Sequence, residues 1–192
     1  YLGASGPADA PGWILPYGDS PFNGENIGEM VYMDILNRAR KYVHIMTPYL
    51  IIDNEMITAL TFAAKRGVDV KLITPGWPDK KTVFAVTRSY YRELIAGGVQ
   101  IYEYSPGFVH AKTFVSDGDT AVTGSINLDY RSLYLHFECA ALMYRTPAAA
   151  DIEADFQKTL AKCRRMTLED CRKDRLGRRL MGWLLRPLAP LM

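Results

Sequence analysis

The sequence has few of the features that mark membrane-spanning, disulfide-stabilised or zinc-binding proteins. No apolar run approaches the ~20 residues that a transmembrane helix needs, and the sequence does not open with a signal-like segment. Only three of the 192 residues are cysteines, Cys139, Cys163 and Cys171, with no C-x-x-C pair and no Cys/His cluster at zinc-ligand spacing. We therefore expect no disulfide framework and no zinc site, but reduced thiols in a cytosolic setting.

A strong net charge is also missing. The 23 Lys and Arg residues nearly balance the 21 Asp and Glu residues, and the net charge of +2 gives no reason to expect a nucleic-acid partner. The length is enough for one domain with a sizeable core. Residues 1–26 are rich in Gly, Pro, Asp and Ser, so we expect an irregular lead-in there, cut from a longer protein, and a single domain over residues 27–192.

Hydrophobic periodicity predicts helices that alternate with short strands. The expected helices span residues 27–41, 54–66 (with Asn54 as N-cap), 79–96, 148–165 and 168–185. The expected strands span residues 42–46, 68–74, 99–104, 112–116, 120–123 and 137–144. This order predicts an α/β fold with parallel pairings covered by helices, and the Asp117-Gly118-Asp119 turn predicts a hairpin.

The chemistry of the chain is concentrated between residues 110 and 127. His110 and Lys112 are two residues apart, so in a strand their side chains share one face, where an ammonium and an imidazole suit an anion. Ser125 and Asn127 repeat the spacing with neutral donors, and backbone N–H groups near Gly124 can add to an anion cradle. The alternative for His110 is a purely structural histidine at the start of a strand.

Two carboxylates nearby allow two interpretations each. Asp117 belongs either to the same site or only to the Asp-Gly turn that it opens. Glu138 lies in the apolar stretch FECAALMY, where a buried carboxylate needs a partner. An imidazole N–H is the natural partner and would have its tautomer fixed by the contact, whereas the alternative is a structural salt bridge.

The spacing of these residues resembles a known motif. His110, Lys112 and Asp117, followed six residues later by Gly124-Ser125-x-Asn127, match the HKD motif of the phospholipase D superfamily at every fixed position and gap. Further stretches resemble the C-terminal half of bacterial cardiolipin synthases: residues 5–7, 47–53, 63–75, 88–104, 127–132 and 137–138. One departure is His136, where that family leads us to expect asparagine.

The resemblance implies a fold and a mechanism. The fold would be a phospholipase D-like half, with a mixed β-sheet flanked by helices on both faces. The catalytic set would be His110, Lys112, Asp117, Ser125, Asn127 and Glu138, with Gly124, Lys112 and Asn127 binding the phosphate. No metal or other cofactor is implied. One histidine attacks phosphorus to form a phosphohistidine, and the second acts as acid and base; by analogy His110 is the acid and base, although the reverse is open.

The family carries two HKD motifs per chain, and this sequence has one. His44 has no lysine two residues on, so the second motif is expected upstream of Tyr1, in a parent protein whose N-terminal helices hold it at the cell membrane. The donor and acceptor would both be phosphatidylglycerol, and this chain alone would be inactive. The alternatives are a homodimeric single-motif phosphodiesterase, nuclease or phospholipase D, and a non-catalytic domain that binds lipid head groups.

The C-terminal segment from Lys162 to Arg186 is strongly basic. It holds nine basic and three acidic residues, a net charge of +6 in a chain of net +2. Leu176, Leu180, Trp183 and Leu184 share one face at helical spacing. The segment is either a packed terminal helix with a solvated basic face or a helix that lies on an anionic membrane surface. Both hold if Leu176 and Leu180 pack inward and the helix projects from Trp183 onward.

Overall fold

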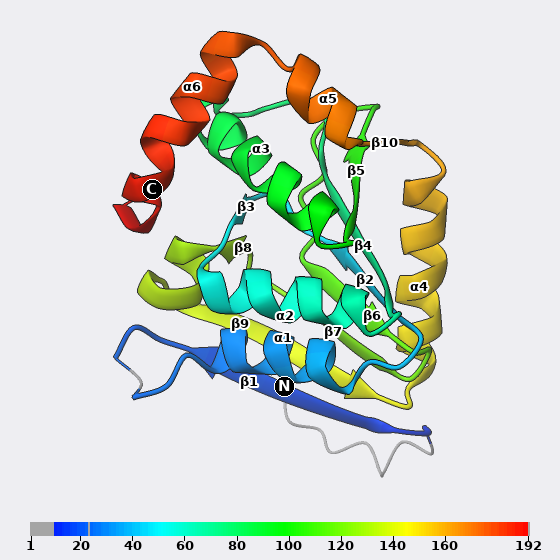
Figure 1. Cartoon of the computed structure of the whole chain (residues 1–192). Helices are drawn as coiled ribbons and strands as arrows, with labels where there is room; N and C mark the ends of the chain where they lie inside the picture. The colour runs from blue at the N-terminus through cyan, green and yellow to red at the C-terminus, as the bar shows by residue number, and fades with distance from the viewer. Residues whose placement is uncertain (1–9, 23, 192) are drawn as a thin grey trace.

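The fold is built on one eight-stranded mixed sheet (Figure 1). A computed structural model describes residues 10–22 and 24–191, so the first nine residues of the expected lead-in, with the resembling stretch 5–7, lie outside it. The strand order is β1-β9-β7-β6-β2-β4-β5-β10. The strands are β1 (Trp13–Asp19), β2 (Tyr42–Met46), β4 (Asp69–Pro75), β5 (Gln100–Tyr104), β6 (Thr113–Ser116), β7 (Thr120–Gly124), β9 (Glu138–Tyr144) and β10 (Cys163–Arg165).

The middle of the sheet is parallel and its flanks are antiparallel. β2 pairs with β4 and β4 with β5 in parallel register, whereas β6, β7, β9 and β1 add antiparallel strands on one side and β10 on the other. A separate two-stranded parallel pair joins β3 (Leu50–Ile51) to β8 (Leu128–Asp129). This small pair brings the chain that follows β7 beside the chain that follows β2.

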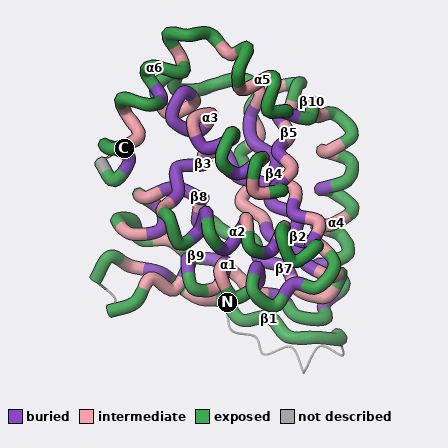
Figure 2. Tube along the Cα trace, in the orientation of Figure 1, coloured by how far each residue is buried: buried purple, intermediate pink, exposed green. Residues whose placement is uncertain are grey.

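Helices cover both faces of the sheet, as the sequence predicts. α1 (Ile27–Arg38), α2 (Asn54–Lys65) and α3 (Lys81–Ala96) lie on one face, and α4 (Pro147–Leu160) packs on the other. The largest apolar cluster fills the space between the sheet and α1–α3, and includes Tyr32, Leu60 and Tyr91. Buried residues accordingly follow the central strands and the inner faces of these helices (Figure 2).

The N-terminal segment corrects one expectation. Residues 13–19, which we expected to be irregular, form the edge strand β1 and pair with β9 from Trp13↔Tyr144 to Asp19↔Glu138. Pro16 and Gly18 led to the wrong prediction, because both residues disfavour central strands. An edge strand tolerates proline, since it leaves one row of backbone groups unpaired.

The C-terminal segment corrects two more. The helix expected over residues 148–165 ends at Leu160, and Cys163–Arg165 instead form β10 against β5. The helix expected over residues 168–185 is divided into α5 (Leu168–Lys173) and α6 (Leu176–Leu185), followed by a 3-10 turn over Arg186–Leu191. The break occurs at Asp174, whose carboxylate is bound by Arg88 and Arg178.

Smaller differences concern caps and termini. Asp53 rather than Asn54 caps α2, because its carboxylate accepts a hydrogen bond from the backbone N–H of Met56 at 2.8 Å. The three cysteines are all described and are all free thiols. Within residues 10–22 and 24–191, none of the helices combines the length and apolar character that crossing a bilayer requires.

Candidate active site

The hairpin of β6 and β7 brings the predicted residues together. Thr113 pairs with Thr123 in antiparallel register, so the loop before β6 lies beside the chain that follows β7. Here His110, Lys112, Gly124, Ser125 and Asn127 border one open cavity of about 540 Å³. The chain around His110 and Lys112 is a loop rather than the strand we expected, since β6 begins only at Thr113.

His110 and Lys112 form a direct pair. The Nζ atom of Lys112 lies 3.0 Å from Nε2 of His110 and donates to the His110 carbonyl oxygen at 2.8 Å. An ammonium group can only donate, so this contact requires an unprotonated Nε2 and places the ring proton on Nδ1. Burial lowers the pKa of Lys112, and the negative charges of Glu138 and Asp129 offset part of that shift. His110 itself is exposed at the cavity mouth.

Ser125 borders the same cavity, and Glu138 holds its hydroxyl group. The Ser125 hydroxyl donates to Oε2 of Glu138 and accepts a hydrogen bond of 3.0 Å from the backbone N–H of Cys139. The Glu138 side chain is 9% exposed, and the imidazole nearest to it is that of His136, with Nδ1 3.9 Å from Oε1. Among the described residues, Glu138 makes no hydrogen bond to an imidazole, and its carboxylate instead holds the Ser125 hydroxyl.

Gly124 is required by packing. A Cβ atom at this position would meet the Cys139 carbonyl oxygen at 2.3 Å and the Ala140 Cα at 2.5 Å, so only glycine lets β7 approach β9 this closely. The backbone N–H of Ser125 donates to the same Cys139 carbonyl at 2.8 Å. This N–H is thus engaged within the protein, contrary to its expected place in an anion cradle.

Asn127 contributes a polar group with one unused atom. Its Nδ2 donates to Ser132 Oγ at 2.9 Å, while its buried Oδ1 has no hydrogen-bond partner. Rotating the amide by half a turn would let the Ser132 hydroxyl donate to Oδ1 and would leave the NH₂ group for a ligand. The arrangement therefore fits an asparagine that donates to an anion when one is bound.

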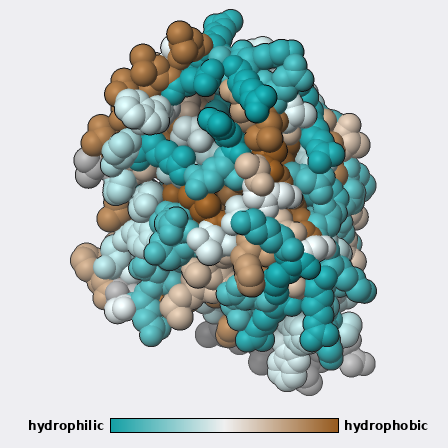
Figure 3. Space-filling model, viewed as in Figure 1, coloured by the Kyte–Doolittle hydropathy of each residue, from teal (hydrophilic) through white to brown (hydrophobic). Residues whose placement is uncertain are grey.

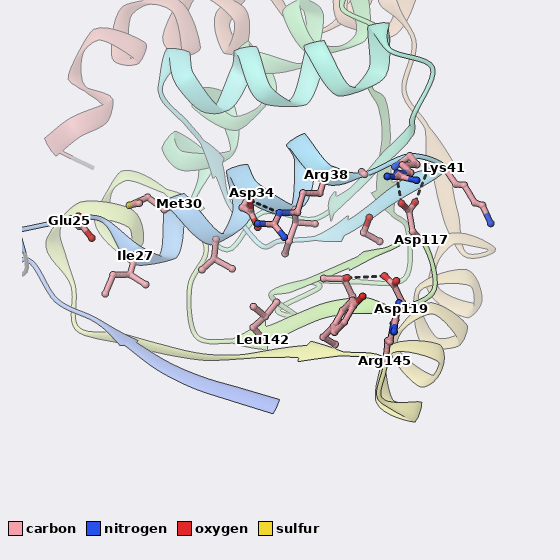
Figure 4. Close-up of a pocket in the computed structure, with 17 residues that line it drawn as sticks. Glu25, Ile27, Met30, Asp34, Arg38, Lys41, Asp117, Asp119, Leu142 and Arg145 are labelled. Carbon is pink, nitrogen blue, oxygen red and sulfur yellow. Dashed lines mark hydrogen bonds and ion pairs between the residues drawn. The ribbon is translucent and has the colours of Figure 1, made fainter. Parts of the chain in front are cut away.

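Asp117 lies apart from these residues, at the far end of β6. Its carboxylate accepts hydrogen bonds from the backbone N–H groups of Arg40, Lys41 and Tyr42 at 2.8, 2.9 and 3.0 Å, and Figure 4 shows Asp117 beside Lys41. Burial alone would raise its pKa, but these three donors outweigh burial and lower it. Of the two interpretations of Asp117, the geometry supports the structural one.

A second cavity of about 220 Å³ adjoins the first through Asn127. Its lining includes Asp129 and His136, neither of which the sequence analysis placed in the site, together with Tyr49 and Lys80. Burial raises the pKa of Asp129. Asp129 continues the two-residue spacing of Ser125 and Asn127, a signal that could have identified it.

The third histidine is structural. His44 is buried in β2, its Nδ1 lies 2.9 Å from Glu153, and its ring stacks on Phe156 at 4.5 Å between centroids. Among the residues that the structure describes, no group of three or more His, Cys, Asp or Glu side chains is arranged to hold a metal ion. The first cavity is therefore bordered by the imidazole of His110, the ammonium of Lys112 and the polar side chains of Ser125 and Asn127, while His136 lies at the adjoining cavity.

The family described as "Cardiolipin synthase, PLD-like domain" matches residues 32–160, which include every residue of the site. The chain belongs to this family. A curated relative from Streptococcus mutans, described as an uncharacterized protein, is 56% identical over 95% of this chain and 40% of its own length. Cardiolipin synthase 2 from Bacillus anthracis is 41% identical over 84% of the chain and 32% of its length. The chain thus spans well under half the length of these relatives.

Solved structures share the fold at low identity. Nuc, a phospholipase D family member from Salmonella typhimurium, superposes with a TM-score of 0.68 at 19% identity, covering 81% of this chain and 99% of that one. A phosphatidylserine synthase from Haemophilus influenzae gives a TM-score of 0.68 at 16% identity, covering 93% of this chain and 45% of that one. The mixed sheet flanked by helices is therefore the phospholipase D fold.

Proposed function

We propose that this chain is the C-terminal catalytic half of a phosphatidyltransferase, which makes cardiolipin and glycerol from two phosphatidylglycerol molecules. The observation that carries the proposal is the pairing of His110 with Lys112 at an open cavity that also holds Ser125 and Asn127. The substrate pair is drawn from the relatives named cardiolipin synthase. The remaining half of the site would come from the part of the relatives that this chain does not span.

The first chemical step transfers a phosphatidyl group to histidine. The histidine of the other half attacks the phosphorus of one phosphatidylglycerol, and a P–N bond forms as the P–O bond to glycerol breaks. His110, in its protonated form, gives its proton to the departing glycerol oxygen. Lys112 and the amide of Asn127 stabilise charge on the phosphoryl oxygens.

The second step transfers the group to the acceptor lipid. His110, now neutral, takes the proton from a hydroxyl of the second phosphatidylglycerol, whose oxygen forms a P–O bond as the P–N bond breaks. The unprotonated Nε2 that faces Lys112 fits this base form of His110. The alternative assignment exchanges the two histidines, and trapping the intermediate separates them, because a phosphoryl group found on His110 would make it the nucleophile.

Reconstitution tests the proposal. The 192-residue chain alone is expected to make no cardiolipin from radiolabelled phosphatidylglycerol, because each step needs two histidines, whereas the full-length parent makes it and releases one glycerol per cardiolipin. Activity should persist in EDTA. Robust turnover by the purified monomeric chain, or loss of activity in EDTA that metal restores, would contradict the proposal.

One observation favours a second candidate, a homodimeric phosphodiesterase. The match to Nuc extends over 99% of that chain, so one copy of this fold accounts for a whole member of the phospholipase D family. In that case two copies of this chain would pair their His110 residues. Two measurements distinguish this candidate from the first: sedimentation equilibrium and hydrolysis of bis(p-nitrophenyl) phosphate. Only the second candidate predicts a dimer whose activity rises with the square of monomer concentration. An inactive parent with intact His110 would leave the non-catalytic alternative.

A further inference from the structure

Helix α6 presents an apolar face to solvent. It packs on α3 through Gly182, where a Cβ atom would meet the Ala85 carbonyl oxygen at 2.4 Å, so the two helix backbones are nearly in contact. The opposite face of α6 carries exposed apolar side chains, with Leu176 78% and Trp183 71% exposed. Leu180 and Leu184 belong to the same face and are also more than half exposed. Figure 3 shows this apolar surface over α6, at the upper left.

The condition under which both interpretations of this segment would hold, with Leu176 and Leu180 packed inward, is not met. The buried side of α6 is formed by Gly182 and, in part, by Arg178 and Leu185, which leaves the leucines and Trp183 on the outside. Isolated apolar residues on a surface are ordinary, whereas a continuous strip bordered by polar side chains marks an interaction site. Neither α5 nor α6 lies within residues 32–160, the part that matches the family.

The arginines around α6 fall into two groups. Arg88, Arg178 and Arg186 are bound by the carboxylates of Asp174 and Glu93, and these ion pairs fasten α6 to α3. Arg92, Arg172 and Arg179 border a cavity of about 360 Å³ beside Trp183, which the three ion-paired arginines, Asp170 and Asp174 also line, so that six arginines face two carboxylates there. Within the described part of the chain, none of the guanidinium groups of Arg92, Arg172 and Arg179 has a carboxylate at ion-pair distance.

We propose that α6 docks on an anionic phospholipid bilayer. Leu176, Leu180 and Leu184 would enter the boundary between head groups and acyl chains, with Trp183 at head-group depth. The cavity with Arg92, Arg172 and Arg179 would receive a lipid phosphate, for which a guanidinium fork is well suited. Charge complementarity favours a bilayer over an apolar partner protein. Such a partner would cover the leucines but would leave three arginines without ion-pair partners beside them.

The docking surface is connected to the site by α3. Lys80 and Val83, at the start of α3, border the cavity that holds Asn127, while Ala85 and Ser89 on the same helix contact α6. Docking would therefore fix the position of the site relative to the bilayer. This consequence depends on the proposed function, whereas the docking itself does not.

Vesicle sedimentation tests the docking with the complete 192-residue chain and without any measurement of activity. We expect the chain to sediment with vesicles of phosphatidylglycerol and phosphatidylcholine but not with phosphatidylcholine alone, and added salt to release it. Changing Arg92, Arg172 and Arg179 together to Ala should lower the partition coefficient on the order of 100-fold, at about fivefold per arginine. The matched control changes the exposed Lys41, Lys65 and Lys158 to Ala and should lower it less than tenfold.

Fluorescence of Trp183 tests the apolar face separately. In a chain with Trp13→Phe and Trp77→Phe, emission should shift to the blue on mixing with the anionic vesicles and should be quenched by brominated lipid. Circular dichroism identifies any variant that fails to fold. In that case the single variant Leu180→Ser is tested instead, and it should bind anionic vesicles more weakly than the original chain. The proposal would be overturned by equal binding to both vesicle types or by equal losses of binding in the two triple variants. It would also be overturned by Trp183 emission that does not shift, or by self-association through α6 that excludes vesicles.

Discussion

The residues of the HKD motif lie at the two ends of strand β6, and their surroundings at the two ends are opposite in kind. At the start of the strand, His110 and Lys112 face an open cavity and hydrogen-bond mainly to one another. At its end, the backbone N–H groups of Arg40, Lys41 and Tyr42, where the chain enters β2, bind the carboxylate of Asp117. A motif that is continuous in the sequence therefore separates in space into one end at an open cavity, which is the reactive end in our proposal, and one end whose carboxylate is bound within the protein.

The difference has a physical basis. At the Asp117 end the chain adopts left-handed backbone angles, with φ of +54° at Asp117 and +81° at Gly118, and the carboxylate links this turn to residues 40–42. At the His110 end the polar groups lie beside a cavity large enough for a phosphate, and one acceptor of Asn127 has no partner. The Asn127 amide thus keeps hydrogen-bonding capacity at the cavity, whereas both oxygens of the Asp117 carboxylate are engaged within the protein.

The change His110→Ala should have the largest effect. In the full-length parent we expect the rate of cardiolipin formation to fall about 10²–10⁴-fold, the usual contribution of general acid–base catalysis. The free energy of unfolding of this chain should change little, because His110 is exposed. Lipid assays and urea denaturation measure the two quantities. A parent that keeps near-normal activity would remove His110 from the site.

The change Asp117→Ala should show the reverse pattern. It leaves three backbone donors without their acceptor, so we expect a loss of about 2–4 kcal/mol in the free energy of unfolding. The rate per folded molecule should stay within about tenfold of the original, since acid–base catalysis worth at least 10²-fold is left in place. Asp119→Ala in the same turn is the matched control, because that carboxylate accepts only from the adjacent Thr120 hydroxyl among the described residues. A larger loss of rate than of stability in Asp117→Ala would return Asp117 to the catalytic set.

The pH dependence of stability distinguishes the contribution of the Asp117 charge from the contribution of its hydrogen-bonding shape. Because the three donors lower its pKa in the folded state, Asp117 stabilises the protein above its ordinary pKa of about 3.9. This stabilisation is lost as the pH falls through the lowered value. Urea denaturation between pH 5 and pH 2.5 should therefore show a shallower fall in stability for Asp117→Asn than for the original chain. Parallel curves would mean that the carboxylate charge contributes nothing.

Local pattern was enough to predict that His110, Lys112, Ser125 and Asn127 lie together, because a single hairpin brings them to one cavity. The same pattern could not place Asp117, whose partners Arg40 to Tyr42 are more than seventy residues away in sequence. Nor could it assign Ser125 to Glu138, since that contact depends on how β7 pairs with β9. Long-range pairing, rather than residue type, decided these contacts.

The terminal regions show the same limit in the fold. Alternating periodicity located β2, β4 and β5 within one residue at each end, because buried central strands are strongly apolar. It missed β1, whose pairing with β9 overrides an unfavourable composition, and β10, which would have continued α4 had β5 not offered an open edge. Ion pairs from Arg88 and Arg178 to Asp174 divide α5 from α6. These are tertiary contacts, and local sequence propensity does not predict them.

The smallest expected effect concerns Glu138 and sharpens the account of the reactive end. Glu138 has two roles in the structure, since it accepts a hydrogen bond from Ser125 and its charge raises the pKa of Lys112 against the effect of burial. Glu138→Gln keeps an acceptor for Ser125, so the rate should fall on the order of 10-fold or less. A larger fall is not expected, because a charge-assisted hydrogen bond contributes about 1.5–3 kcal/mol in total and only part of it is lost. The change also removes the charge that favours the ammonium form.

The alkaline side of the pH–rate profile distinguishes these two roles. Without the Glu138 charge, the pKa of Lys112 falls further below its ordinary value, so Lys112 loses its proton at a lower pH and the alkaline limb of the profile moves to lower pH. Ser125→Ala is the complementary control, because it removes the hydrogen bond that Glu138→Gln retains and keeps the carboxylate charge, so it should lower the rate without that movement. If both variants leave the limb where it is, the charge of Glu138 does not act on Lys112, and its role is to hold Ser125.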